Sequence, residues 1–156
     1  MLSLFTDGGV IGRNPSLLGG TWAWCLIDGD EIIRSASGAV DPKDIDLLTV
    51  SNNTTELLAA VLGLEATGPG FSGVWYTDSK VTVYRLTTST KFKGCPDWLR
   101  NRALAVRENQ KYTVKLLGGH PNKAELTTGI RSDGAPVSKW NVWCDKECRR
   151  LAKEYG

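Results

Sequence analysis

Acidic residues stand at the ends of two short apolar runs, where their charges would need a partner. Asp7 follows the run at residues 2–6 and precedes two glycines, and Asp78 follows the run at residues 74–77. Asp-Gly is typical of a turn, which would explain Asp7 without any function. If the two runs are neighbouring strands, about 4.8 Å apart, both carboxylates lie at one edge of a sheet. Their mutual repulsion would then favour a bound cation.

Two further acids lie early in predicted helices. Glu56 is in the first turns of a helix predicted over residues 52–67, and Asp145 is in the first turns of one predicted over residues 141–155. Each has an ordinary explanation, because Asn53-x-x-Glu56 resembles a capping box and a carboxylate suits the helix dipole. As a set of hard oxygen ligands, the four acids would favour Mg²⁺ or Mn²⁺ over zinc.

Basic residues are concentrated between Ser79 and Lys115. This segment holds nine basic and two acidic residues, although the whole chain has a formal net charge of only +2. Such an excess would attract a polyanion, nucleic acid above all. A solvated helix face balanced by acids elsewhere would give the same pattern, so the charge alone leaves both interpretations open.

The elements that must position these residues are those of an α/β fold with a five-stranded mixed sheet flanked by helices. Hydrophobic alternation and turn signals predict an antiparallel three-strand meander and two further strands, at residues 2–6, 20–27, 31–39, 74–77 and 112–119. Helical periodicity predicts helices at residues 52–67, at two places within 79–110 with Pro96 opening the second, and at 141–155. A helix between two strands implies a crossover that makes them parallel. Residues 120–138 are expected to form a loop.

The bulk composition indicates a single domain over residues 1–156. The chain is 41% apolar, and no apolar run approaches the length of a membrane helix. The absence of a targeting segment predicts a cytoplasmic location. Cys144 and Cys148 could begin a zinc site with His120, the only histidine, but the lack of a C-x-x-C pair favours reduced core thiols.

Five short motifs, in this order, resemble those of type 1 ribonuclease H. They are "TDGG" at 6–9, "NNTTELLA" at 52–59, "YTDSK" at 76–80, "GGHP" at 118–121 and "NVWCDKECRRLA" at 141–152. Together they span nearly the whole chain. The resemblance implies the ribonuclease H-like fold and endonucleolytic hydrolysis of the RNA strand of RNA–DNA hybrids, with 5′-phosphate products. Its implied partner is the hybrid duplex, and it implies a monomer with no membrane and no protein partner.

The resemblance also implies a role for each matching residue. Catalysis is assigned to Asp7, Glu56, Asp78, His120 and Asp145. The four acids would bind two Mg²⁺ ions, for which Mn²⁺ can substitute. Asp7 would bridge both ions, with Asp78 between them or beside the second. Glu56 would lie near the leaving group and Asp145 near the ion that activates water, while His120 would assist proton transfer or product release.

Substrate contacts are predicted from the same resemblance and from the basic segment. The candidates are Gly8, Asn14, Ser51, Asn52, Lys91, Lys93, Trp98 and Arg100. Gly8 and Asn52 are expected on the RNA strand, and Asn14 and Ser51 at a DNA phosphate. The remaining four would form a short basic protrusion. The sequence departs from the family at the enlarged segment 121–144, and at Lys80, where the family often has an amide.

Two alternative interpretations are retained. One is another nuclease of this fold, a junction resolvase or an exonuclease, although exonucleases usually open with Asp-x-Glu and this chain has Asp7-Gly8-Gly9. The other is a non-catalytic nucleic-acid-binding module. Four acids disfavour the second alternative, because carboxylates near phosphate weaken binding unless metal ions intervene.

Overall fold

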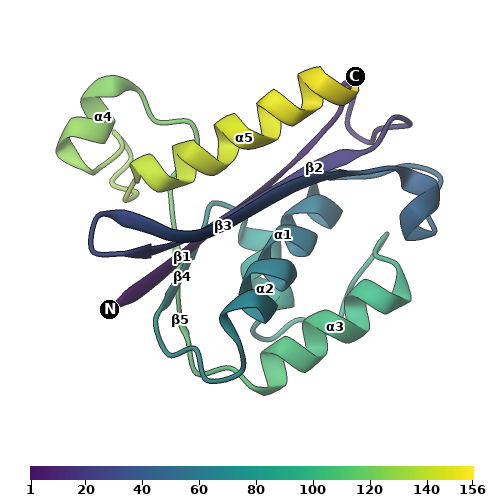
Figure 1. Ribbon diagram of the computed structural model, residues 1–156, viewed down its shortest axis with the longest axis horizontal. Helices are drawn as coiled ribbons and strands as arrows, with labels where there is room; N and C mark the ends of the chain where they lie inside the picture. The colour runs from purple at the N-terminus through teal and green to yellow at the C-terminus, as the bar shows by residue number, and fades with distance from the viewer.

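A five-stranded mixed sheet forms the centre of the protein (Figure 1); the computed structural model describes residues 1–156. Its strands, in chain order, are β1 (Leu2–Val10), β2 (Gly20–Asp28), β3 (Glu31–Val40), β4 (Val74–Thr77) and β5 (Thr113–Leu116). The spatial order is β3-β2-β1-β4-β5, with antiparallel pairing among β1, β2 and β3 and parallel pairing of β4 with β1 and β5. The predicted fold class, a meander extended by parallel strands, is confirmed.

Helices cover both faces of the sheet. They are the short 3₁₀ helix η1 (Pro42–Ile45), α1 (Asn52–Thr67), α2 (Lys80–Arg85), α3 (Asp97–Glu108), α4 (Lys123–Thr128) and α5 (Lys139–Tyr155). Figure 1 shows α1, α2 and α3 on one side of the sheet and α5 on the other. None of the helices combines the length and the apolar character that a membrane span would require.

Successive side chains of β1 enter two separate cores, because neighbours along a strand point to opposite faces. Leu4 belongs to the larger core with Leu57 of α1. Phe5 belongs to the smaller core with Cys144 of α5. Helices α1 and α5 therefore hold β1 from opposite sides, immediately before Asp7.

The cysteines are free thiols, as the sequence indicated. Cys25, Cys144 and Cys148 are buried in the smaller core, and the Sγ atoms of Cys25 and Cys144 lie 3.8 Å apart. They fill space between the sheet and α5, which is the core role that the sequence favoured over a zinc site.

Strand β1 is longer than predicted, and the expected turn after Thr6 is wrong. Gly8 and Gly9 continue the strand and pair with Trp22 and Thr21 of β2. The reason is that β2 is long enough to pair with β1 along its whole length. On its other side β1 pairs with β4 only as far as Phe5, opposite Tyr76. Asp7 is thus inside a strand, two residues past the end of the parallel pairing.

The segment 120–138, expected to be a loop, also contains regular structure. It includes α4, which Asn122 and Glu125 open with a capping box and Gly129 closes in the left-handed conformation. An antiparallel bridge then joins Ile130 to Pro136. The prediction failed because α4 has no buried residue, so it leaves no apolar periodicity in the sequence.

Candidate active site

Three carboxylates converge at the end of the parallel pairing. Asp7 comes from β1, Glu56 from α1 and Asp78 from the residue after β4, and each offers an oxygen atom within 4.8 Å of the others. Asp7 and Glu56 are only 4% and 5% exposed. One oxygen of Glu56, Oε2, is buried without a hydrogen-bond partner. Buried charges without such partners are costly, so this cluster suits a bound cation.

Gly8 allows Glu56 to come so close to Asp7. A Cβ atom at Gly8 would overlap the backbone of α1 and lie 2.6 Å from the carbonyl oxygen of Thr55. Only glycine therefore permits the strand and the helix to approach this closely. Gly8 also lines the cleft beside the acids. Its contact with the substrate stays a prediction.

The start of α1 turns Glu56 inward rather than into a cap. Ser51 is the N-cap, and its hydroxyl accepts a hydrogen bond of 3.3 Å from the backbone N–H of Thr54. The capping box suggested by Asn53 and Glu56 is not formed, which removes the ordinary explanation for Glu56. Asn52 and Asn53 line the cleft, and the Asn52 N–H donates to Oδ1 of Asn14 at 3.1 Å.

Burial and mutual repulsion make the acids resist ionisation in the metal-free protein. Burial, followed by the charge of Asp78, raises the pKa of Asp7 to about 7. The pKa of Glu56 is raised well above its usual range by burial and by Asp7. Burial also raises the pKa of Asp78, against the lowering effects of the Asn141 amide and the charge of His120. A cation beside these oxygens would offset their repulsion and favour the ionised carboxylates.

Asp145 lies outside this triad but lines the same cleft. Its Oδ2 forms an ion pair with Nε of Arg149, one turn further along α5, at 3.1 Å. Its charge is among the smaller causes that raise the pKa of Asp7 and of Asp78. Of the four predicted acids, the structure thus joins three directly and places the fourth nearby.

A polar cleft of about 470 Å³ opens over the acids. Its lining consists of Asp7, Gly8, Gly9, Asn52, Asn53, Glu56, Asp78, Ser79, Lys80, Val81, Gly119, His120 and Asp145. A second cleft of about 230 Å³ shares Asp78, His120 and Asp145 and adds Lys146 and Arg149 among its lining residues. The two clefts thus meet at these shared residues, and their lining carries both amides and basic groups.

His120 follows β5 and lies beside the triad. It lines both clefts and adopts a left-handed backbone conformation with φ of 50°. The preceding Gly119 lies against Asp78, because a Cβ there would be 3.1 Å from Oδ2 of Asp78. The structure places His120 in the same cleft as the acids, and its part in catalysis stays a prediction.

Asn141 is a site residue that the sequence analysis did not single out. It is 2% exposed, and its Nδ2 donates a hydrogen bond of 3.3 Å to Oδ2 of Asp78. Its own Oδ1 has no partner. A signal was present, because Asn141 opens the motif that contains Asp145, but only the packing of α5 shows which carboxylate it contacts.

The remaining predicted substrate residues lie outside the cleft lining. Asn14 and Ser51 support the start of α1, as described above. Trp98 is half-buried and donates from Nε1 to the carbonyl oxygen of Ile45 at 3.4 Å. Arg100 lies 5.9 Å from the ring centre of Phe92. Lys91 and Lys93 are exposed, in the connection between α2 and α3. For all six residues, contact with the substrate stays a prediction.

Part of the basic segment has an internal structural role. Arg85 is 5% exposed and donates from Nη2 to the carbonyl oxygen of Lys93 at 3.0 Å. Arg107 donates from Nη1 to the carbonyl oxygen of Ser89 at 2.7 Å. Arg102 forms an ion pair with Glu65. The positive charge offered to a polyanion is consequently smaller than the composition of the segment suggested.

Solved structures of ribonuclease H domains share this fold. The N-terminal RNase H domain of rv2228c from Mycobacterium tuberculosis, solved as a fusion with maltose-binding protein, is 16% identical with a TM-score of 0.62, over 99% of this chain and 94% of that chain. RNase H1 from the halophilic archaeon Halobacterium salinarum NRC-1 is 19% identical with a TM-score of 0.62, over 98% of both chains. LC9-RNase H1, a type 1 RNase H with the type 2 active-site motif, is 14% identical with a TM-score of 0.65, over 99% of this chain and 73% of that chain.

These similarities concern the fold. No protein-family model matches the chain, and no curated protein matches it in sequence. The chain has the fold of type 1 ribonuclease H, as its motifs predicted, and it carries a buried acidic triad in that fold.

Proposed function

We propose that the protein is a ribonuclease H, which cuts the RNA strand of RNA–DNA hybrids internally and leaves 5′-phosphate ends. The observation that supports this most directly is the triad of Asp7, Glu56 and Asp78, buried in a ribonuclease H fold and opening into a polar cleft. A carboxylate cluster of this kind destabilises the metal-free fold, so its presence calls for a function that uses it.

The residues present fit divalent cations. The three triad oxygens are close enough to share an ion, and the unpartnered Oε2 of Glu56 is available as a ligand. Asp145, in the same cleft, would serve as a fourth ligand once released from Arg149. We propose two Mg²⁺ ions, replaceable by Mn²⁺, which when bound would lower the pKa of an attacking water and stabilise the departing 3′ oxygen.

The other cleft residues would bind and orient the substrate. Asn52 and Asn53 present amide groups at the cleft, where they can meet the 2′-hydroxyls that distinguish RNA from DNA. Lys80 can meet a phosphate next to the acids. His120 lies within the same lining and can carry a proton to or from the reacting phosphate.

A cleavage assay with four substrates tests the proposal. Labelled RNA–DNA hybrid, single-stranded RNA, double-stranded RNA and a four-way DNA junction are incubated with the protein in Mg²⁺ or in EDTA. We expect internal cuts in the RNA of the hybrid only, and only with Mg²⁺. Retention of the hybrid without cutting would favour a binding module, junction cutting a resolvase, and shortening from one end an exonuclease.

We further propose that residues 1–156 act as one domain and as a monomer. Two cores share one sheet, which is the arrangement of a single folding unit. Light scattering coupled to size-exclusion chromatography should give a mass near 17.0 kDa. A mass of twice this value would replace the monomer by a dimer.

A further inference from the structure

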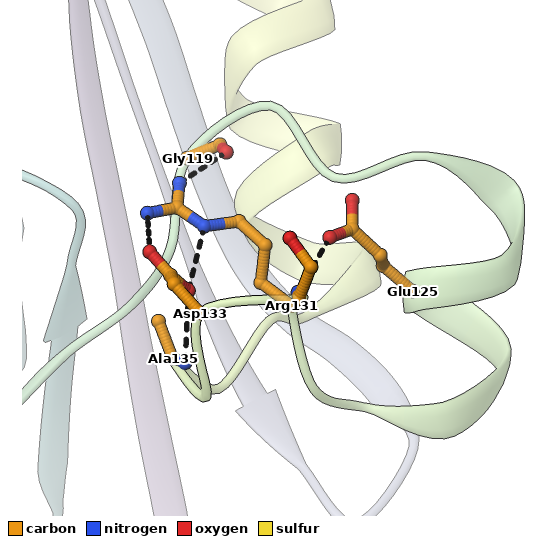
Figure 2. A network of polar contacts seen from close by, with 6 residues as sticks. Gly119, Glu125, Arg131, Asp133 and Ala135 are labelled. Atoms are coloured by element: carbon orange, nitrogen blue, oxygen red, sulfur yellow. Dashed lines mark hydrogen bonds and ion pairs between the residues drawn. The ribbon is translucent and has the colours of Figure 1, made fainter.

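The enlarged segment between His120 and Asp145 folds around one arginine, Arg131. Its Nη1 donates a hydrogen bond of 3.0 Å to the carbonyl oxygen of Gly119. Its Nε donates to Oδ1 of Asp133 at 3.1 Å, and Nη2 to Oδ2 of the same carboxylate at 2.5 Å. Figure 2 shows the guanidinium of Arg131 between the carbonyl of Gly119 and the carboxylate of Asp133.

We propose that Arg131 is a positioning residue, which fixes His120 beside Asp78 by holding the peptide group in front of it. The effect of Arg131 on cleavage rests on the proposed function. Its structural part, the placement of His120, stands on the contacts of the segment 121–144.

The planarity of the peptide bond connects Arg131 to His120. The carbonyl of Gly119 and the N–H of His120 belong to one rigid plane. A hydrogen bond that holds the carbonyl therefore also sets the direction in which the chain enters His120. Because the φ of His120 is 50°, a conformation that residues other than glycine seldom adopt, it needs such support from its surroundings.

The sequence before His120 cannot supply this support. Gly119 has no room for a side chain, because a Cβ would lie 3.1 Å from Oδ2 of Asp78. Gly118 is tight as well, since its Cβ would lie 3.2 Å from that of Ala135. Two successive glycines leave the backbone free to adopt many conformations. Contacts from outside the dipeptide must therefore hold it in one of them.

The segment around Arg131 is built to provide that contact. The N–H of Gly118 donates to the carbonyl of Pro136, and the N–H of Arg131 donates to the carbonyl of Ala135, both at 2.7 Å. The carboxylate of Asp133 in turn accepts from the N–H of Ala135 at 3.1 Å. These bonds form a short hairpin that presents Arg131 to Gly119.

Helix α4 fixes the near end of the same hairpin. The carboxylate of Glu125 accepts hydrogen bonds from the N–H groups of Asn122 and Ser132, at 3.0 Å and 2.9 Å.

The hydrogen bonds from Arg131 and Ala135 lower the pKa of Asp133 to about 2. The ion pair with Arg131 is consequently intact throughout the pH range in which the protein would be assayed.

The imidazole of His120 is a direct reporter of its own placement, because the chain contains one histidine. Nuclear magnetic resonance of the metal-free protein, purified without a histidine tag, gives a single set of imidazole signals. We expect Arg131→Ala to shift or broaden this set. Arg131→Lys should do the same, since one ammonium group cannot hold both Gly119 and Asp133 in the guanidinium geometry.

A matched control is Arg150→Ala. Arg150 also pairs with carboxylates, Glu147 and Glu154, but both lie within α5 and outside the segment 121–144. The Arg150→Ala variant should leave the imidazole signals of His120 unchanged. An unchanged signal in both Arg131 variants, or an equal change in Arg150→Ala, would overturn the proposal.

Kinetics on the hybrid give an independent readout. We expect Arg131→Ala to lower kcat about tenfold at unchanged KM. In a His120→Ala background the same change should have no further effect, because Arg131 acts through His120. An equal loss in both backgrounds would overturn the proposal. Asp133→Asn, which keeps the guanidinium, should give a smaller loss and serves if Arg131→Ala fails to fold.

The two proposals fail separately. A wild-type protein that does not cut the hybrid, while its imidazole signals respond to Arg131→Ala, refutes ribonuclease activity and supports the placement of His120 by Arg131. If the wild type cuts the hybrid, while Arg131→Ala changes neither the imidazole signals nor kcat, the placement of His120 by Arg131 is refuted and the ribonuclease activity is supported.

Discussion

Asp7 illustrates how a single carboxylate can be costly for the fold and useful for function. It lies inside β1, is 4% exposed, and faces two other acids. A carboxylate so placed weakens the metal-free protein whenever it is ionised. The same placement, with oxygens of Glu56 and Asp78 within 4.8 Å, is one that could hold a divalent cation.

Replacing Asp7 by asparagine should stabilise the metal-free protein at neutral pH. The pKa of Asp7 is raised to about 7 in the folded state from 3.8, so the folded state binds the extra proton between these values. Stability contributed by this group is therefore lost as the pH rises from about 4 to about 7. In EDTA, Asp7→Asn should increase the free energy of unfolding by about 2–4 kcal/mol at pH 7.5 and by much less at pH 4.

Urea denaturation at the two pH values measures this difference. The comparison of the variant with the wild type at each pH removes the contribution of all other titrating groups. An equal effect at pH 4 and pH 7.5 would show that ionisation of Asp7 is not what destabilises the fold.

Replacing Asp78 by asparagine should abolish both cleavage and stabilisation by Mg²⁺. Loss of one ligand charge should reduce the cleavage rate by about 10³-fold, which corresponds to several kcal/mol of transition-state stabilisation. In the wild type, Mg²⁺ at about one hundred times its Kd should add about 2.7 kcal/mol to the free energy of unfolding. The variant should lose most of this increment, as followed by thermal denaturation with and without Mg²⁺.

A second outcome of that experiment is equally informative. If Asp78→Asn keeps the stabilisation by Mg²⁺ but loses cleavage, then Asp78 acts on the substrate rather than as a ligand. If the variant keeps cleavage at the wild-type rate, the assignment of the site is wrong.

At the scale of elements, the close approach of α1 to β1 determines whether the site forms. Gly8→Ala would force a methyl group into the backbone of Thr55 and Glu56. We expect a loss of about 1–3 kcal/mol in stability, typical of overpacking, together with a loss of cleavage as Glu56 moves away from Asp7. Circular dichroism during denaturation and the hybrid assay check the two effects.

Gly70→Ala is a suitable control for this substitution. A Cβ at Gly70 would meet no atom within 4 Å, and its backbone has no positive φ. The change should alter stability by less than about 0.5 kcal/mol and leave cleavage unchanged. Equal effects at Gly8 and Gly70 would mean that loss of glycine flexibility, rather than the clash with α1, causes the damage.

The elements also show what the sequence could and could not predict. Alternation of Trp22, Trp24 and Leu26 with small residues predicted β2 correctly, because each face of that strand has its own core. The predicted end of β1 was wrong because Gly8 and Gly9 usually indicate a turn. In the structure, long-range pairing with β2 and contact with α1 keep these two glycines in the strand.

The candidate site was predictable to the extent that its residues lie in contiguous motifs. Asp7, Glu56 and Asp78 each stand within one, and the structure joins them. The contact of Asn141 with Asp78 depends on how α5 packs on the sheet, and no local pattern encodes it. The same holds for Arg131, whose partner Gly119 is brought close only by the hairpin that follows α4.

At the scale of the whole molecule, the remaining exposed positive charge should govern affinity for the hybrid. Lys91 and Lys93 are exposed and free of ion pairs. We expect Lys91→Gln with Lys93→Gln to weaken hybrid binding and to reduce the slope of log K against log salt by up to about 2, one for each lost phosphate contact.

Binding at several salt concentrations with the Asp78→Asn protein, which should not cut its ligand, measures this slope. Arg102→Gln is the control, because Arg102 is already paired with Glu65 and should contribute little. A slope that is unchanged in the double lysine variant would place the duplex away from the α2–α3 connection.

The division of the site between two cores has a consequence for the order in which the protein becomes active. Synthesis from the N-terminus delivers Asp7, Glu56 and Asp78 first, on elements that share the larger core or border it. Asn141 and Asp145 arrive only with α5, which packs on the opposite face. Until α5 packs on the sheet, the chain would therefore hold Asp7, Glu56 and Asp78 without the groups that α5 adds to the cleft, and cleavage of a hybrid would have to wait for that step.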